Sequence, residues 1–268
     1  MQKQITLLIT GFIAVVASAG GLAQSDALDC LITPSETVDI SSETMGLINL
    51  INVDRGDYVS AGEVIAELAS GVEQANLVLA RERAADQSEI DQAQARLRFL
   101  KGQESRASEL FAQSLESRET LDQAEMERIL AEHAVTRAQV NQRLAQLEMQ
   151  RSEEILKQKT IISPIDGVVM HRDMRVGEFV NETSSIMRLA QIDPLYVEIF
   201  VPLDFYNQVA EGDIATVRLR PPLSGDYQAI VGVVDYVMDA ASGTFGVRLI
   251  LENPDREIPA GVRCEAVL

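Results

Sequence analysis

The chain has 268 residues, and its 23 lysines and arginines against 41 aspartates and glutamates give a formal net charge of −18 at pH 7. This length leaves room for one or two domains with a substantial hydrophobic core. The acidic balance argues against a nucleic-acid partner, because binding to phosphates depends on clustered Lys and Arg.

Residues 1–23 have the pattern of a secretory signal peptide. The basic Lys3 precedes an apolar run that begins at Ile5, and the small residues Gly21 and Ala23 suit signal cleavage. A retained membrane anchor is the alternative interpretation. We favour the cleaved signal, because the apolar run of about 13 to 15 residues is shorter than the roughly 20 that span a bilayer.

Two stretches far apart in the chain repeat one pattern. Gly46 is followed ten positions later by Gly56, and Gly167 is followed at the same distance by Gly177. In each copy the first glycine enters a strand, and the second lies at a turn and precedes an acid. A copy of roughly 30 residues cannot bury its apolar face alone. We therefore predict that the two copies close on each other as one domain.

Between the copies, residues 70–159 have the composition of long helices, with only two glycines and no proline. Two series of residues recur at alternating spacings of three and four, which predicts two helices packed as a coiled coil. The first series is Ile90, Ala93, Leu97, Leu100, Ala107 and Phe111, broken at Glu104. The second is Leu121, Ala124, Ala131, Val135, Ala138, Ala145, Met149 and Leu156, broken at Arg128, Gln142 and Ser152.

The two series lose phase between Phe111 and Leu121, where Ser114 and Ser117 are candidate helix N-caps. A reversal at this point predicts an antiparallel hairpin with arms of about 40 residues, each about 60 Å long. Because the seam is rich in alanine, the two helices should lie close together. A coiled coil that only dimerises is the alternative interpretation of this segment.

After Thr160 the chain changes to short strands rich in Val and Ile, separated by Gly, Pro, Asn and Asp. The stretch from Pro194 to Leu268 predicts a small antiparallel barrel or sandwich. Two cysteines, Cys30 and Cys264, lie near opposite ends of the chain. In an oxidising compartment they could form a disulfide, and otherwise they are two small apolar residues.

The order of these segments resembles the periplasmic adaptors, or membrane fusion proteins (HlyD/AcrA-like family), of tripartite efflux pumps. The two repeats look like the halves of a lipoyl or biotinyl domain, with Gly46, Gly56, Gly167 and Gly177 as its turn glycines. The resemblance covers nearly all of the chain after the signal peptide. Family-like phrases are "GDYVSAGEVIAEL" at 56–68, "ISPIDGVV" at 162–169, "PLYVEIFVP" at 194–202 and the closing "LENPDREIPAGVRCEAVL".

The resemblance implies an α+β fold and an elongated modular protein. Its expected parts are a split lipoyl-like β-sandwich (41–69 and 160–192), an antiparallel α-helical coiled-coil hairpin (70–159) and a small antiparallel β-barrel (24–40 and 193–268). Many family members continue into a membrane-proximal domain after the barrel. This chain is expected to lack that domain, so contact with the transporter would fall to the barrel.

The resemblance also implies a periplasmic protein, associated with the inner membrane through its partner, that does no chemistry. Such an adaptor links an inner-membrane transporter of RND or ABC type to an outer-membrane TolC-like channel. It works as a homo-oligomer, a hexameric ring or a trimer of dimers. The rival hypotheses are an accessory carrier of lipoyl or biotinyl type and a structural coiled-coil protein of the envelope.

In the adaptors that this chain resembles, an Arg, a Leu four residues on and a Ser seven residues further mark the contact with the channel. Arg106, Leu110 and Ser117 have these spacings. Arg can donate to carbonyls or carboxylates of a partner, the leucine offers an apolar knob, and the serine caps its own helix. In the alternative interpretation they are a solvated charge, a seam residue and a cap. The family usually has an apolar residue before the serine; here Glu116 stands there, unless Leu115 substitutes.

No catalytic residues are predicted, and we expect no enzyme activity. His133 and His171 lie on different predicted elements, and neither has a partner serine or cysteine. Met170, His171 and Met174 could act as soft metal ligands, but an ordinary strand and turn is the favoured interpretation, so no metal is predicted.

No cofactor is predicted either. A lipoyl or biotinyl carrier presents a modified lysine in the turn between its halves. Here the turn after Leu68 reads "ASGVEQ", without a lysine. We therefore expect the helical hairpin to replace the attachment site.

Overall fold

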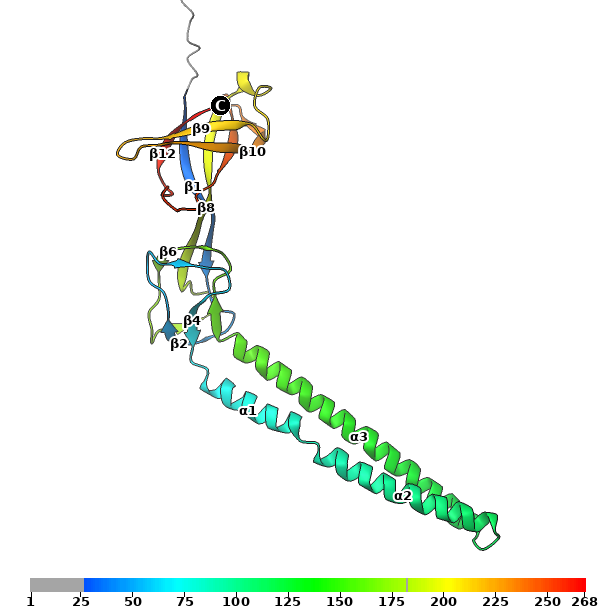
Figure 1. The fold of residues 1–268 in the computed structure, drawn as a ribbon. Coiled ribbons are helices and arrows are strands. Elements are labelled where there is room, and N and C mark those ends of the chain that lie inside the picture. Colours follow the sequence, from blue (N-terminus) through cyan, green and yellow to red (C-terminus); the bar gives the residue numbers. More distant parts are fainter. Residues whose placement is uncertain (1–26, 182) are drawn as a thin grey trace, which may run out of the picture. The chain divides into compact units, whose positions relative to one another are not determined.

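The computed structural model describes residues 27–181 and 183–268, so the signal peptide predicted over residues 1–23 lies outside the described residues. The fold is mixed α+β, with a long helical hairpin and two β-structures (Figure 1). Within the described ranges, no helix is both long and apolar enough to cross a membrane.

The chain divides into two compact units. Among the described residues, the barrel unit contains 27–33, Tyr196–Glu252 and Pro259–Leu268. The sandwich–hairpin unit contains Pro34–Leu195 and Asn253–Ile258.

The barrel unit is built from antiparallel strands joined in the order β1-β12-β9-β10-β11-β8, and β1 also pairs with β8, which closes the sheet. Side chains alternate along each strand: in β11, Val247 and Leu249 are buried while Arg248 and Ile250 are exposed. A short 3-10 helix, Leu203–Phe205, follows β8. The strands are β1 (Leu28–Ile40), β8 (Met187–Pro202), β9 (Ile214–Leu219), β10 (Asp226–Asp239), β11 (Thr244–Leu251) and β12 (Arg263–Val267).

A disulfide joins the two cysteines, a pairing that the sequence left open. Cys30 on β1 lies directly opposite Cys264 on β12, and their sulfur atoms are 2.10 Å apart. Both residues are buried. The bond therefore ties the first strand of the barrel unit to its last.

The sandwich contains strands from both sequence repeats. One sheet has the order β5-β4-β2-β7, and the other side is formed by β3, β6 and the first part of β8. The core between them includes the fully buried Ile48, Ile65, Val180, Ile186 and Leu189. The other strands of the sandwich are β2 (Gly46–Ile51), β3 (Tyr58–Val59), β4 (Val64–Leu68), β5 (Thr160–Ile162), β6 (Gly167–Arg172) and β7 (Phe179–Val180).

The two repeats interlock reciprocally, which confirms that they close on each other. Each residue of the first copy has its counterpart 121 positions later in the chain. The Gly56 N–H donates to the Val169 carbonyl at 2.9 Å, and the equivalent Gly177 N–H donates to the Ile48 carbonyl at 2.9 Å. The register of β3 on β6 matches that of β7 on β2, and the bulge between β2 and β4 recurs between β6 and β8.

The repeat glycines have two different physical roles. Gly56 and Gly177 have φ of +94° and +89°, a left-handed backbone that favours glycine. Gly167 begins β6 close to the neighbouring strand, where a Cβ atom would lie 2.5 Å from the Ala190 carbonyl oxygen. At the equivalent Gly46 a Cβ would lie 3.3 Å from Cδ1 of Leu68, the mobile end of a side chain.

Gly167→Ala should therefore destabilise the sandwich by about 1–3 kcal/mol, because a strand backbone must shift to admit the new methyl group. Gly46→Ala should cost less, although the two glycines are equivalent in the repeat, since only a side-chain end must move. Urea denaturation followed by circular dichroism would measure both. Gly71→Ala is the control, because no heavy atom lies within 4 Å of its would-be Cβ. Equal losses for Gly46→Ala and Gly167→Ala would contradict this explanation.

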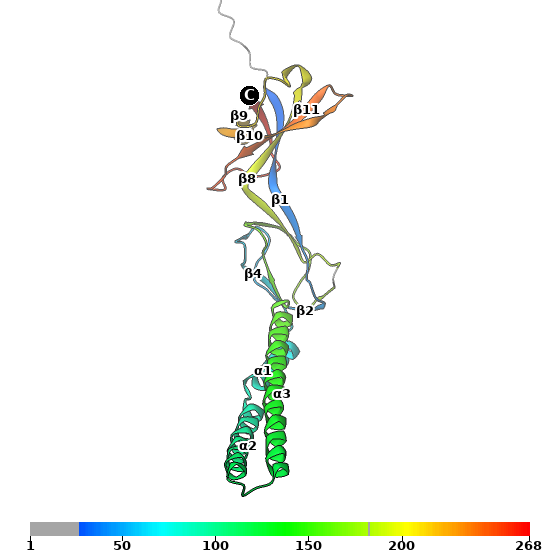
Figure 2. The same ribbon diagram turned by 90° about the vertical axis from the view of Figure 1, so that its right-hand side faces the viewer.

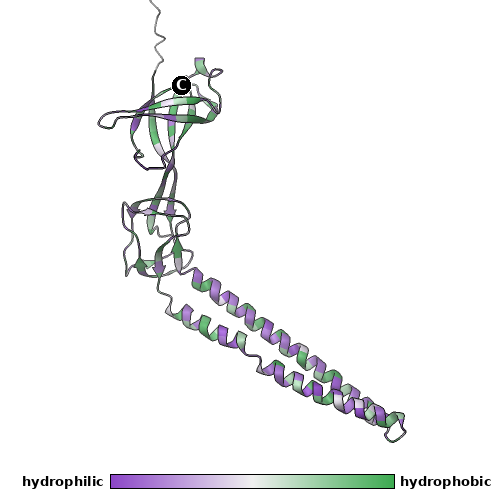
Figure 3. Ribbon diagram, viewed as in Figure 1, coloured by the Kyte–Doolittle hydropathy of each residue, from purple (hydrophilic) through white to green (hydrophobic). Residues whose placement is uncertain are grey.

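The hairpin has three helices, α1 (Gly71–Ala85), α2 (Ser88–Ala112) and α3 (Arg118–Lys157). The α1 and α2 helices both pack against α3 (Figure 2). Figure 3 shows that these helices carry hydrophilic and hydrophobic positions in alternation, as expected for a solvent-exposed coiled coil.

The first arm is not the continuous helix that the sequence predicted, because it breaks at Asp86. That residue has an extended backbone, and its Oδ1 accepts the Ser88 N–H at 2.9 Å, which lowers the pKa of the carboxyl. The apolar phase also changes here. The buried Ala84 of α1 and Ile90 of α2 are six residues apart, whereas a continuous heptad pattern would place them seven apart. The break at Asp86 accommodates this shift of one residue in the apolar pattern.

The predicted seam is buried at its centre, at Leu100, Ala107, Ala131 and Ala138. Two polar residues that interrupt the seam, Glu104 and Arg128, pair with each other. Arg128 Nε lies 2.8 Å from Glu104 Oε2, and the Arg128 and Glu104 side chains are only 21% and 27% exposed. Arg128 also donates to Glu132 at 2.7 Å, and Glu132 lies 3.4 Å from Lys101.

These contacts favour the charged forms of Arg128 and Glu132. The hydrogen bonds to Glu132 and then to Glu104 raise the pKa of the Arg128 guanidinium. Accepting from Arg128 holds the pKa of Glu132 below its usual value. The polar break in the seam is therefore an interhelical ion-pair cluster.

Arg128→Leu should lower the urea midpoint of the helical signal, because it leaves the Glu104 carboxylate half-buried in an apolar seam without its partner. The double variant Glu104→Leu/Arg128→Leu should recover most of the loss, since both polar groups are removed together. Arg143→Leu, at an exposed position of α3, serves as the control. A double variant that is no more stable than the single one would show that the ion pair is not the cause.

Candidate functional site: the hairpin tip

The tip begins where α2 ends, in a hydrogen-bonded turn. The Ser114 N–H donates to the Phe111 carbonyl and the Leu115 N–H to the Leu110 carbonyl, both at 2.9 Å. Ser114 has φ of +58°, so the turn is a Schellman motif with serine at the left-handed position. The sequence offered Ser114 as a helix N-cap; this was wrong, because Ser114 closes the end of α2 and does not begin α3.

The start of α3 is capped by Ser117. Its Oγ accepts the Thr120 N–H at 3.2 Å and lies 2.9 Å from the Thr120 hydroxyl. The backbone of Ser117 is extended, as an N-cap residue requires. Only Gln113–Ser117 separate α2 from α3. The reversal is thus a short loop with a hydrogen-bonded cap on each side.

Arg106, Leu110 and Ser117 are all exposed near this loop. Arg106 and Leu110 lie one helical turn apart on α2, outside the seam position of the buried Ala107. The Arg106 side chain turns back along the helix, with Nη1 3.5 Å from the position of a Cβ on Gly102. Leu110 is 39% exposed.

Arg118 is a tip residue that the sequence analysis did not single out. The Arg118 guanidinium lies 5.9 Å from the centre of the Phe111 ring and forms an ion pair with Asp122 at 2.9 Å. The four-residue Arg–Asp spacing at a helix start was the available signal. Leu115 is 68% exposed and Glu116 is also exposed, so the loop itself offers an apolar side chain next to an acid.

The residues considered for metal binding lie in different environments. Met170 and His171 are exposed neighbours on β6, and Met174 packs against the sandwich core. His133 is exposed on α3. Over residues 27–181 and 183–268, no three or more His, Cys, Asp or Glu side chains gather in a way that could hold a metal ion.

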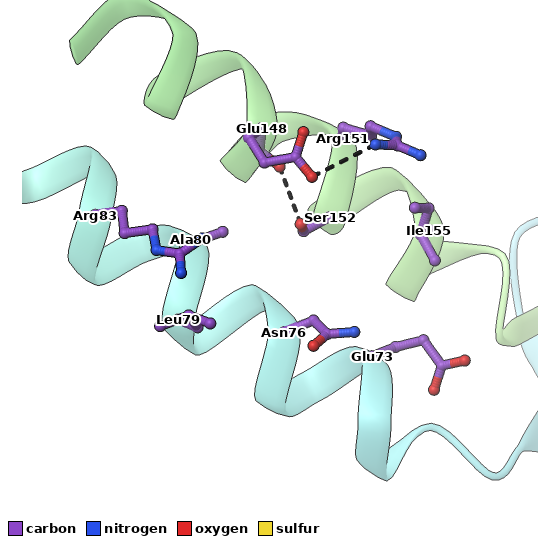
Figure 4. A pocket seen from close by; sticks show the side chains of 9 residues that line it. All are labelled: Glu73, Asn76, Leu79, Ala80, Arg83, Glu148, Arg151, Ser152 and Ile155. Atoms are coloured by element: carbon purple, nitrogen blue, oxygen red, sulfur yellow. Dashed lines mark hydrogen bonds and ion pairs between the residues drawn. The ribbon is translucent and has the colours of Figure 1, made fainter. Parts of the chain in front are cut away.

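A groove of about 360 Å³ lies between α1 and α3 toward the base of the hairpin (Figure 4). Ser152, one of the polar residues that interrupt the predicted seam, lines this groove. Its hydroxyl donates to the Glu148 carbonyl at 2.9 Å. Arg151 pairs with Glu148 at 3.5 Å. The lining residues are Glu73, Asn76, Leu79, Ala80, Arg83, Glu148, Arg151, Ser152 and Ile155.

This chain is similar to one protein family and to several known proteins. The family described as "CzcB-like, barrel-sandwich hybrid domain" matches residues 36–191. The nickel-cobalt-cadmium resistance protein NccB of Alcaligenes xylosoxydans xylosoxydans is 29% identical over 230 residues, which cover 84% of this chain and 54% of NccB. The efflux pump periplasmic linker BepD of Brucella suis is 24% identical over 262 residues, which cover 87% of this chain and 60% of BepD.

A solved structure shares the fold. The crystal structure of MacA from Actinobacillus actinomycetemcomitans matches with a TM-score of 0.75 and 23% identity, over 90% of this chain and 76% of MacA. The chain spans little more than half the length of the curated relatives it matches. Because the family match extends over more than half of its residues, the chain belongs to the CzcB-like barrel-sandwich hybrid domain family of membrane fusion proteins.

Proposed function

We propose that this chain is the periplasmic adaptor of a tripartite efflux system. It links an inner-membrane transporter, of RND or ABC type, to an outer-membrane TolC-like channel, and it acts as a ring of copies associated with the inner membrane through the transporter. It performs no chemistry. The barrel, residues 24–40 and 193–268, faces the transporter, the lipoyl-like sandwich forms a collar, and the hairpin, residues 70–159, reaches the channel.

The observation that carries this proposal is the exposed tip of a hairpin inserted in a barrel-sandwich hybrid domain. Arg106 and Leu110 are exposed near the end of the hairpin and lie close to the short loop before Ser117. A guanidinium can donate to carbonyls at the helix ends of a partner, and an exposed leucine can fill a groove between partner helices. The names of two relatives, an efflux pump periplasmic linker and a metal resistance protein, are consistent with a role in export.

The sandwich supports the adaptor hypothesis over a lipoyl-type carrier. The turn that would present a modified lysine leads from Leu68 into α1 at Gly71, and it contains no lysine. The exposed tip favours the adaptor over an envelope protein whose coiled coil is purely structural. An intact mass without an added cofactor would test the first distinction, and copurification of a channel that depends on Arg106 would test the second.

Leu110→Glu should abolish export and channel copurification while leaving the helical circular dichroism signal unchanged, because Leu110 is partly exposed and outside the seam. The assay is export in a strain that lacks the native chain and is complemented with the variant. Leu223→Glu is the control for channel copurification, which it should leave unchanged, since Leu223 is 36% exposed, close to the 39% of Leu110, but lies in the barrel unit. Normal export by the Leu110→Glu variant would contradict the proposed contact between Leu110 and the channel.

Ser117→Asp separates capping from contact. Aspartate is as good an N-cap as serine, so α3 should start unchanged, but the added negative charge alters the tip surface. We expect export to be lost with helix content retained. Ser117→Ala, which removes the cap, should instead cost about 1 kcal/mol of stability. If Ser117→Asp exports like the native chain, Ser117 acts only as a cap.

A further inference from the structure

The sheet of the barrel unit is closed by β1, which pairs with β12 on one side and with β8 on the other. On the β12 side, residues 28–31 lie opposite residues 263–266. The Ile32 N–H donates to the Val262 carbonyl at 2.9 Å, and the Gly261 N–H donates to the Ile32 carbonyl at 2.8 Å, which continues the pairing. We call this pairing of residues 28–32 with residues 261–266 the closing junction.

The two faces of the closing junction carry different side chains, because neighbouring residues of a strand point to opposite faces. Cys30 and Cys264 lie opposite each other on the buried face and form the disulfide. On the outer face, Asp29 lies directly opposite Glu265. Two carboxylates in this position repel each other. The repulsion acts next to the place where the two sulfur atoms must meet.

Arg220, the residue after β9, lies between these two carboxylates. Its Nη2 donates to Asp29 Oδ1 and lies 3.1 Å from Glu265 Oε1, and its Nε donates to the same Glu265 oxygen at 3.2 Å. Each of these exposed contacts contributes little by itself. Together they offset the repulsion and favour the register in which Asp29 faces Glu265. In that register Cys30 faces Cys264.

We propose that the disulfide is an oxidation-dependent lock on the barrel, and that Arg220 is the positioning residue that brings its two thiols together. The two cysteines are separated by 234 residues, so they meet slowly in an unfolded chain. In the reduced chain the Arg220 bridge holds β1 in register on β12, and oxidation then makes the closure covalent. The lock lies beyond the proposed function, because it concerns how the barrel closes and not what it contacts.

The oxidation requires a disulfide donor, which can be a protein disulfide or glutathione disulfide in an oxidising compartment. The Cys30 thiolate attacks the donor, forms a mixed disulfide with one donor sulfur and releases the other as a thiolate. The Cys264 thiolate then attacks the Cys30 sulfur and displaces the second donor thiolate. Two electrons pass to the donor, and the two protons of the cysteine thiols end on the donor's thiols.

The folded barrel protects the bond once it has formed. Cys30 is 6% exposed and Cys264 is fully buried. A reducing thiolate must reach one of the two sulfur atoms, and access limits the rate of this exchange. Such access requires β1 to separate from β12, which the bond itself opposes. The closed barrel should therefore keep its disulfide in a thiol pool that reduces an exposed one.

Oxidative refolding of the purified full chain tests the role of Arg220. The chain is reduced in urea, diluted into a glutathione redox buffer and sampled with a maleimide that adds mass to each remaining thiol. Arg220→Gln should form the disulfide about two- to fivefold more slowly than the native chain, the range that exposed ion pairs give. Arg220→Lys should recover part of the rate, because it keeps the charge without the planar fork. Arg248→Gln is the control, since Arg248 pairs with Glu198 at 2.7 Å and joins β11 to β8.

The double variant Asp29→Asn/Arg220→Gln separates positioning from general stability. It removes one of the two facing carboxylates, so it should oxidise at close to the native rate, and this comparison decides the question if Arg220→Gln alone fails to refold. In urea, where the register is absent, all variants should oxidise equally slowly. The proposed role of Arg220 is overturned if Arg220→Gln oxidises like the native chain, if Arg248→Gln is slowed equally, or if the double variant is slow.

Reduction of the folded chain tests the lock itself. In reduced glutathione the native chain should keep its disulfide without urea and lose it once urea unfolds the barrel. In Cys30→Ser/Cys264→Ser, amide hydrogens of residues 28–32 should exchange about tenfold faster than in the native chain, while β2 and β4 of the sandwich should be unchanged. Rapid reduction without urea, or unchanged exchange in β1, would show that the disulfide does not lock the barrel.

Discussion

The reciprocal closure of the two β-repeats is the constraint on which the rest of the chain depends. Neither repeat can bury its apolar face alone, and each supplies backbone donors and acceptors to the other through Gly56 and Gly177. The closure makes β4 and β5 neighbours, with Val64 opposite Ile162. Since β4 leads into the hairpin and β5 follows it, both ends of the hairpin emerge from adjacent strands of one sheet.

The base of the hairpin is tied to that sheet by Lys159. Its side chain is only 11% exposed, and its ammonium lies 3.3 Å from Glu73 at the start of α1 and donates to the Met45 carbonyl at 3.1 Å. Farther along, the Ala-rich seam allows close approach of the helices, and the Glu104–Arg128 pair sets their register. The α3 helix thus packs one face against its own first arm, where Ala131 and Ala138 are buried.

The hydrophobic cores and the proposed contact residues therefore lie in different parts of the molecule. The cores of the barrel unit and the sandwich hold the fold, whereas Arg106 and Leu110 lie at the surface of a long helix. Surface positions of this kind can change a partner without changing a core. The proposed contact at the tip uses only such surface positions: a guanidinium, an exposed leucine and a capped loop.

The sequence alone determined the features that depend on residues close together in the chain, namely helix periodicity, turn glycines and helix caps. The glycine repeat predicted the split sandwich, the spacing of three and four predicted the seam, and Ser117 was recognised as a cap. Tertiary structure decided what depends on contacts between distant segments. It paired Cys30 with Cys264 and joined Glu104 to Arg128. It also broke the first arm at Asp86, because this arm must keep packing against α3 although its apolar pattern shifts by one residue.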